Sequence, residues 1–174
     1  MAEEKQTPKI EKAEIVSSES KTHEGDKKTE KKIASENLMV VIRIAGQVKV
    51  IGDVKNTLER LRLRKKYSCV LLKPTKEILG MVNKIRYHIA FGNIDKKTLV
   101  ELIKARGKTL DKSEVNAEKI ADELISGKRL LELGLKPFFS LHPPRKGIKS
   151  KLQYPKGVLG NNKEDINKLV ERML

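Results

Sequence analysis

The fold is decided by one run of β-branched residues and by the two shorter apolar runs that follow it. The first run is Met39-Val40-Val41-Ile42-Arg43-Ile44-Ala45. β-Branched side chains favour extended backbone, so this run predicts a strand. A second strand is predicted from Tyr67 to Lys73, where Pro74 stops it. A third is predicted from Tyr87 to Phe91, before the turn residues Gly92-Asn93.

Two amphipathic helices are predicted between these strands. Asp53 is placed to cap a helix that runs to about Leu63, and Thr75 to cap one that runs to about Ile85. Each apolar helix face needs an apolar partner, so both helices must cover the same face of the sheet. Residues 38–94 therefore predict an α+β fold: a three-stranded β-α-β-α-β sheet with two helices on one face, related to the ferredoxin-like folds.

The pattern becomes purely helical over residues 95–134. Asp95 is placed to cap a helix from Lys96 to Arg106, which Gly107 ends. Asn116 is placed to cap another that runs to Ser126. We expect residues 95–134 to form a helical satellite of the sheet unit.

The segment 135–174 loses this periodicity until its end. Prolines and glycines punctuate it, which predicts an extended segment. Asn162 is placed to cap a terminal helix, with Asp165 at the third position as in a capping box. A long irregular stretch inside a compact protein is typical of a functional segment held by a partner.

The positive charge of the chain lies outside its first 37 residues. The whole chain has net charge +15, from 38 Lys and Arg against 23 Asp and Glu. Residues 1–37 hold 8 Lys and 9 Asp or Glu, so residues 38–174 hold 38 − 8 = 30 against 23 − 9 = 14, a net +16. The charge is densest in residues 60–66 and in residues 133–163, which contain no Asp or Glu. A solvated surface is the ordinary explanation of a charge run, but uncompensated like charge indicates a polyanionic partner.

Residues 1–37 are rich in Lys, Glu, Ser and Thr and have few apolar residues. Such a segment buries too little apolar surface to offset its ordering entropy, which predicts a disordered N-terminal tail. The alternative is an arm that folds on RNA, but such arms are usually basic and this segment is balanced.

Several other classes are excluded by composition. A single cysteine, Cys69, rules out an internal disulfide framework and a Cys-rich zinc site. The apolar runs are shorter than a membrane span, and the N-terminus does not resemble a secretory signal. The three histidines His23, His88 and His142 have no metal-ligand spacing, and no catalytic motif is present. We expect a cytoplasmic protein that is not an enzyme and has no cofactor or metal.

One short motif stands out, His142-Pro143-Pro144-Arg145-Lys146-Gly147. The prolines stiffen the chain and lower the entropy lost on docking. Arg145 presents a planar fork that suits phosphate, and Gly147 permits close approach of backbone. A solvent-exposed proline turn is the alternative interpretation.

The ordered set of motifs across residues 38–174 resembles a known family. The matching stretches are Thr57-Leu58 to Leu63-Arg64, Gly80 to Ile85, Tyr87 to Asp95, Gly134 to Arg145, and Gly160 to Asn167. They resemble the archaeal and eukaryotic form of large-subunit ribosomal protein L thirty, whose eukaryotic counterpart is called L seven. In that family a Trp often replaces Phe91 and a Gly commonly replaces Lys146, and residues 1–37 match nothing in it.

The resemblance implies a structural role in translation, as a monomer within the large ribosomal subunit that binds large-subunit rRNA. Candidate further partners are 5S rRNA and neighbouring large-subunit proteins. The basic clusters then predict phosphate contacts from Arg60, Arg62, Arg64, Lys65, Lys66, Lys84, Arg86, Arg145, Lys146, Lys149 and Lys151. The rival hypothesis is a DNA-binding regulator with a helix-turn-helix at residues 95–134, although its linker is longer than the usual turn.

Overall fold

The computed structural model describes residues 38–110 and 116–174, so the predicted tail 1–37 lies outside the described residues. The elements, in chain order, are β1 (Met39–Arg43), α2 (Gly52–Arg60), β2 (Ser68–Leu72), α3 (Lys76–Lys84), β3 (Ile89–Asn93), α4 (Lys96–Arg106), α5 (Ala117–Ile125), β4 (Phe139–Ser140), β5 (Gly160–Asn161), the 3-10 turn η1 (Lys163–Asp165) and α6 (Ile166–Glu171).

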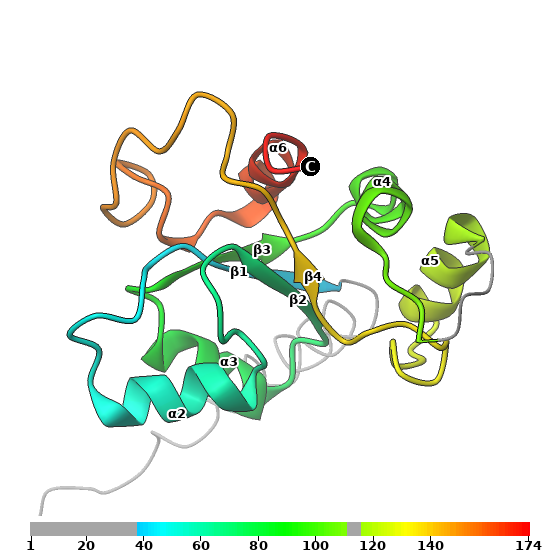
Figure 1. The fold of residues 1–174 in the computed structure, drawn as a ribbon, viewed down its shortest axis with the longest axis horizontal. Coiled ribbons are helices and arrows are strands. Elements are labelled where there is room, and N and C mark those ends of the chain that lie inside the picture. The colour runs from blue at the N-terminus through cyan, green and yellow to red at the C-terminus, as the bar shows by residue number, and fades with distance from the viewer. Residues whose placement is uncertain (1–37, 111–115) are drawn as a thin grey trace, which may run out of the picture. The chain divides into compact units, whose positions relative to one another are not determined.

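The strands form one sheet in the order β4-β2-β1-β3-β5. Figure 1 labels the first four of these strands in chain order, β1 to β4. Central β1 pairs antiparallel with both β2 and β3, so Met39 lies opposite Leu72 on one side and Asn93 on the other. The predicted β-α-β-α-β sheet is confirmed. The predicted exit turn at Gly92-Asn93 is wrong, because both residues belong to β3 and pair with β1. Two further strands extend it: β4 pairs antiparallel with β2, and β5 pairs parallel with β3. Periodicity predicts neither, because each contributes only two residues.

Strand β1 is buried along its whole length, and its side chains alternate between two apolar layers. Met39 and Val41 belong to one buried cluster, with Leu58 of α2 and Val82 of α3. Figure 1 shows α2 and α3 together on that face of the sheet. The prediction that both helices cover one face is confirmed.

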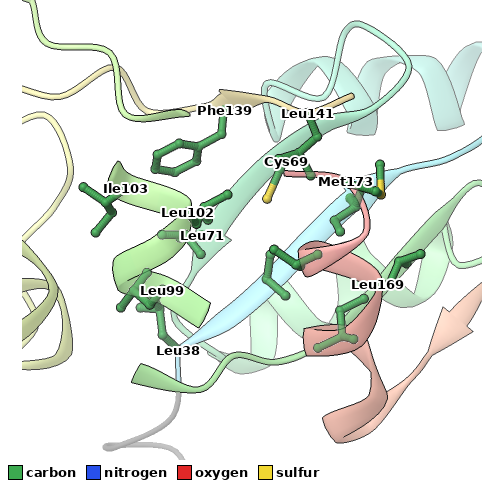
Figure 2. Close-up of a cluster of buried hydrophobic side chains, with 14 of the residues drawn as sticks. Leu38, Cys69, Leu71, Leu99, Leu102, Ile103, Phe139, Leu141, Leu169 and Met173 are labelled. Atoms are coloured by element: carbon green, nitrogen blue, oxygen red, sulfur yellow. The ribbon is translucent and has the colours of Figure 1, made fainter. Parts of the chain in front are cut away.

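The second face of the sheet is covered by elements from the later part of the chain. Val40 and Ile42 share a buried cluster with residues of α4, α5 and α6. Figure 2 shows Leu99 and Leu102 of α4 near Leu71 of β2, whereas Leu169 and Met173 lie farther along the same face of the sheet. With apolar cover on both faces, β1 carries a continuous apolar run instead of an alternating one. The division of the chain into a core, a satellite and a C-terminal segment stays a prediction.

Helix starts follow the predictions only in part. The Thr75 hydroxyl accepts a hydrogen bond from the Ile78 N–H at 3.3 Å, which confirms the predicted cap of α3. The prediction for Asp53 is wrong, because Ile51 occupies the N-cap position of α2, two residues earlier, and Asp53 lies in the first turn of the helix. Asp95 and Asn116 hold the N-cap positions of α4 and α5 without a side-chain hydrogen bond there.

The capping box predicted at the terminal helix is also wrong. The buried Asn162 side chain donates to the Val158 carbonyl at 3.0 Å, which ties it to the preceding loop. Asn161 instead accepts from the Lys163 N–H at 3.0 Å. The turn η1 then separates this polar start from α6.

Gly92 marks the closest approach between the sheet and the C-terminal segment. A Cβ atom there would lie 2.2 Å from the Lys163 carbonyl oxygen and 3.0 Å from the Ile166 side chain. Only a residue without a side chain lets η1 and α6 pack this closely on β3.

We predict that Gly92→Ala lowers the free energy of unfolding by about 1–3 kcal/mol, because overpacking forces backbone to move. Urea unfolding would measure the loss. Gly80→Ala is the matched control: Gly80 lies within α3 with nothing within 4 Å of an added Cβ. It should stabilise the protein by up to about 1 kcal/mol through helix propensity. Equal effects of the two substitutions would contradict this account.

Candidate nucleic-acid interface

The structure exposes all eleven cations that were predicted as phosphate contacts. They lie at the end of α2 and in its connection to β2, at the end of α3 and in its connection to β3, and in the segment between β4 and β5. Among the described residues, Lys84 is the only one of the eleven that pairs with a carboxylate. Its ammonium lies 3.7 Å from Asp53, with both side chains at least half exposed. The remaining ten have no internal counter-ion in the described part of the chain.

The connection from α2 to β2 is held in place by Arg43 at the end of β1. Only 2% of this arginine is exposed. Its guanidinium donates to the carbonyls of Leu63 at 2.7 Å, Arg64 at 3.0 Å, Gly46 at 2.9 Å and Ala45 at 3.0 Å. Burial lowers the pKa of Arg43, but an arginine titrates so far above neutrality that the group stays charged. A buried cation thus lies directly beneath an exposed basic loop.

The loop after β1 adds a second support. The Gln47 amide donates to the Arg64 carbonyl at 2.6 Å. The backbone of Arg62 has φ of 60°, a left-handed conformation that a non-glycine residue adopts only under constraint. These hydrogen bonds set the path on which Arg64, Lys65 and Lys66 project outward.

The proline motif is fastened to the same region and to the end of α6. The Leu141 N–H donates to the Tyr67 carbonyl at 3.0 Å, next to the basic loop. The Arg172 guanidinium donates to the carbonyls of Arg145 at 2.8 Å and Gly147 at 2.9 Å. The motif is therefore an anchored loop, and Arg145 and Lys146 remain exposed on it.

Lys146 adopts a left-handed backbone with φ of 65°. Glycine reaches this conformation without steric cost. A lysine at this position therefore carries some backbone strain that a glycine would not.

The third part of the site is the end of α3 and its connection to β3. The Arg86 guanidinium lies 4.9 Å from the centre of the Tyr87 ring and donates to its hydroxyl at 2.9 Å. Tyr87 is 57% exposed. The Gln153 amide donates to the Arg86 carbonyl at 3.4 Å, which links the segment that carries Lys149 and Lys151 to this connection.

These three parts meet at one end of the sheet, where β1 ends and where β2 and β3 begin. The Tyr67 N–H donates to the Arg43 carbonyl at 2.7 Å, and the Ile44 N–H donates to the His88 carbonyl at 3.0 Å. We call the exposed cations of these three connected segments the sheet-end surface. It consists of Arg64, Lys65, Lys66, Arg86, Arg145 and Lys146.

The other predicted residues lie apart from this surface or at its margin. Arg60 and Arg62 line a groove beside β2. Lys84 points to Asp53 on α2. Lys149 and Lys151 follow the proline motif in the loop that leads to β5.

Sequence reasoning missed four residues that shape the site: Arg43, Gln47, Tyr87 and Arg172. Arg43 carried a usable signal, because a charged residue inside an apolar strand run must find buried partners. Gln47 and Arg172 act through contacts with residues far away in the sequence, and no local pattern identifies them. Tyr87 contacts the adjacent Arg86, so this arginine-tyrosine pair was visible in the sequence.

Other reactive groups give no sign of catalytic chemistry. Cys69 is buried in the sheet, and burial raises the pKa of its thiol, which keeps it protonated and unreactive. Burial, and then the charge of Arg43, lowers the pKa of His88, so its imidazole is neutral near pH 7. No group of three or more His, Cys, Asp or Glu residues with metal-binding geometry occurs in residues 38–110 and 116–174. Within the same residues, no helix is long and apolar enough to cross a membrane.

Anchored cationic loops at one end of an α+β sheet are suited to bind the backbone of a polyanion without reading its sequence. The fold and the site together thus place the chain in the class of basic nucleic-acid-binding proteins.

Comparison with known proteins narrows this class. The family model described as Ribosomal protein L30p/L7e matches residues 39–89. The large ribosomal subunit protein uL30 of Archaeoglobus fulgidus is 36% identical over 151 residues, which cover 78% of this chain and 99% of that protein. The uL30 proteins of Nanoarchaeum equitans and Desulfurococcus amylolyticus are 37% and 38% identical, and each alignment covers 79% of this chain and at least 98% of the relative. The chain belongs to the L30p/L7e family of ribosomal proteins, in its archaeal type.

The rival hypothesis of a helix-turn-helix is not favoured. A recognition helix needs a face that tolerates phosphates, whereas α5 presents Glu118 and Asp122, which pair with Lys104 and Lys96 of α4. The other face of α5 is buried through Ala117, Ala121 and Leu124. The exposed face of α5 thus presents carboxylates, which disfavour approach to the phosphates of a DNA groove.

We predict that Arg43→Met lowers the free energy of unfolding by at least about 2 kcal/mol, because it leaves carbonyls of the basic loop without donors. Arg43→Lys should recover only part of this loss, since three donors on a point charge cannot replace the planar fork. Urea unfolding would measure both variants. Limited trypsin digestion should also cut the Met variant faster between residues 60 and 66. Unchanged stability and unchanged digestion would show that the loop does not depend on Arg43.

Proposed function

We propose that the protein is a structural constituent of the large ribosomal subunit, where it binds large-subunit rRNA and catalyses no reaction. The observation that carries this proposal is the sheet-end surface. Its six cations project from anchored loops and have no carboxylate partner within the described residues. Because the chain belongs to a ribosomal protein family, the polyanion on this proposal is rRNA.

Binding is expected to proceed through phosphates rather than through base edges. Phosphate contacts position a protein on a nucleic acid and carry no sequence information themselves. Each neutralised phosphate releases counterions, which makes the affinity strong and dependent on salt. The anchored loops favour this mode, because side chains on a fixed backbone lose less entropy when they bind.

Specificity on this proposal comes from the shape of the RNA. Side chains cannot read the deep, narrow major groove of A-form RNA, so proteins recognise its folded shape and its single-stranded loops. Arg145 and Arg64 can form two parallel hydrogen bonds with one phosphate, which the lysines cannot. Contacts with 5S rRNA and with neighbouring large-subunit proteins are finer proposals of the same kind.

All eleven predicted cations remain proposed contacts. Lys84 would exchange Asp53 for a phosphate, and this exchange costs little, because exposed ion pairs contribute only about 0–1 kcal/mol. Arg60 and Arg62 would contact RNA at the margin of the interface.

We predict that the double variant Arg145→Glu with Lys146→Glu weakens incorporation into large subunits at least about tenfold without unfolding the protein, because it turns attraction into repulsion at an exposed loop. Co-sedimentation with large subunits at rising salt would measure this.

The matched control for that variant is Lys97→Glu with Lys119→Glu. Both lysines are exposed, on α4 and α5, and the net charge changes by the same amount. The control should incorporate almost normally. If both double variants lose affinity equally, total charge matters and the sheet-end surface does not.

We also predict that deletion of residues 1–37 leaves rRNA binding nearly intact, since the segment carries 8 Lys against 9 Asp or Glu and adds no net positive charge. Filter binding of rRNA at several salt concentrations should give the same slope for the full and the shortened chain. A large loss of affinity would identify the segment as an RNA-binding arm.

A further inference from the structure

The outer edge of β2 is only half covered. On one side the strand pairs with β1 from Cys69 to Leu72. On the other side β4 pairs with Ser68 and Cys69 alone. Among the described residues no strand lies beside Val70–Leu72 on that outer edge. A strand edge without a neighbour offers a row of backbone donors and acceptors to another extended chain.

A groove of about 460 Å³ opens beside this edge. One wall is the end of α2 with Ile78 of α3, and the other is Leu124 of α5 with the turn 128–131. Pro137 lines the groove just before β4 begins. Proline has no N–H and cannot continue a strand ladder. The pairing between β4 and β2 therefore does not extend to Pro137.

The lining combines an apolar interior with a basic rim. Leu61, Val70, Leu72 and Leu130 are among its apolar residues, and none of its residues is acidic. The cations are Arg60, Arg62, Lys73, Lys128 and Arg129. Lys128 already pairs with Glu123, and Lys73 donates to the Gly127 carbonyl. The guanidinium groups of the three arginines form no ion pair within the described residues, although the Arg129 backbone N–H donates to the Glu132 carboxylate at 3.2 Å.

We propose that this groove binds an extended segment of a partner protein in which acidic and apolar residues alternate. The segment would add to the sheet beside Val70–Leu72, as in other cases where a peptide joins an open strand edge. Alternate residues of a strand point to opposite sides. Its apolar residues would therefore fill the interior while its acidic residues face the arginines of the rim.

A protein segment fits this lining better than RNA does. Phosphates and riboses would leave the apolar interior uncovered by apolar atoms, whereas leucine or valine side chains would bury it. The strand edge also matches the hydrogen-bonding groups of another peptide backbone. This inference shares Arg60 and Arg62 with the proposed rRNA contacts. Its test therefore uses Leu131 and Arg129, which line the groove and are not among the proposed rRNA contacts.

The test is a selection from random heptapeptides displayed on phage, against the full chain. An enriched peptide is then synthesised, and its affinity is measured by fluorescence polarisation. We expect enriched sequences to alternate acidic and apolar residues. Leu131→Asp, on the groove wall at 48% exposure, should weaken the peptide at least about tenfold. Leu152→Asp, at a leucine of 60% exposure that is not part of the groove lining, should change the affinity less than about twofold.

A second variant guards against misfolding of the first. Arg129→Glu should also weaken binding of the acidic peptide. Neither groove variant should alter rRNA binding, so failure of this proposal is distinct from failure of the ribosomal one.

The proposal is overturned if no acidic sequence is enriched, or if Leu131→Asp and Leu152→Asp weaken peptide binding equally. Competition by a single-stranded RNA oligonucleotide that depends on Leu131 would assign the groove to RNA. Peptide binding only after deletion of residues 1–37 would assign it to the chain itself, and self-association abolished by Leu131→Asp would assign it to a second copy.

Discussion

The burial of β1 on both faces is the constraint on which the other features depend. A strand with apolar side chains in both directions is stable only between two covering layers. The helices α2 and α3 form one layer, and the second needs α4 and α6, which come from later parts of the chain. Gly92 then sets how closely the second layer approaches the sheet. The C-terminal segment is thereby committed to a fixed path across the molecule.

That path creates the cationic surface. Arg43 ends the central strand, and its guanidinium gathers the carbonyls of two loops. A neutral residue could not donate to four acceptors, and an acidic partner would cancel the charge that the site needs. The arginine therefore serves stability and electrostatics at once. Arg172 likewise both stabilises the proline motif and preserves its charge. Its guanidinium donates to two backbone carbonyls of the motif, and the side chains of Arg145 and Lys146 stay exposed to solvent.

Much of the fold was predictable from local patterns. The three long strands, the helices between them and the Thr75 cap follow from residue type and spacing over a few positions. The short strands β4 and β5 were not predictable, because their two residues pair only where tertiary contacts bring them to an edge. The capping box at the terminal helix failed for a related reason: Asn162 is buried, and its amide binds the Val158 carbonyl instead of the helix start. The cations of the site were identifiable by charge density, but the residues that position them were not.

By itself the sequence determined the class of fold, the absence of charge excess in its first 37 residues, and the two basic stretches that indicate a polyanionic partner. These properties are local or additive, so they can be read without coordinates. Only the tertiary structure decided that Leu141 meets Tyr67 at one end of the sheet, whereas Arg60 and Arg62 line a separate groove. Both outcomes depend on backbone hydrogen bonds between distant residues, such as Leu141 to Tyr67 and Arg43 to Leu63, and no pattern along the chain encodes those pairings.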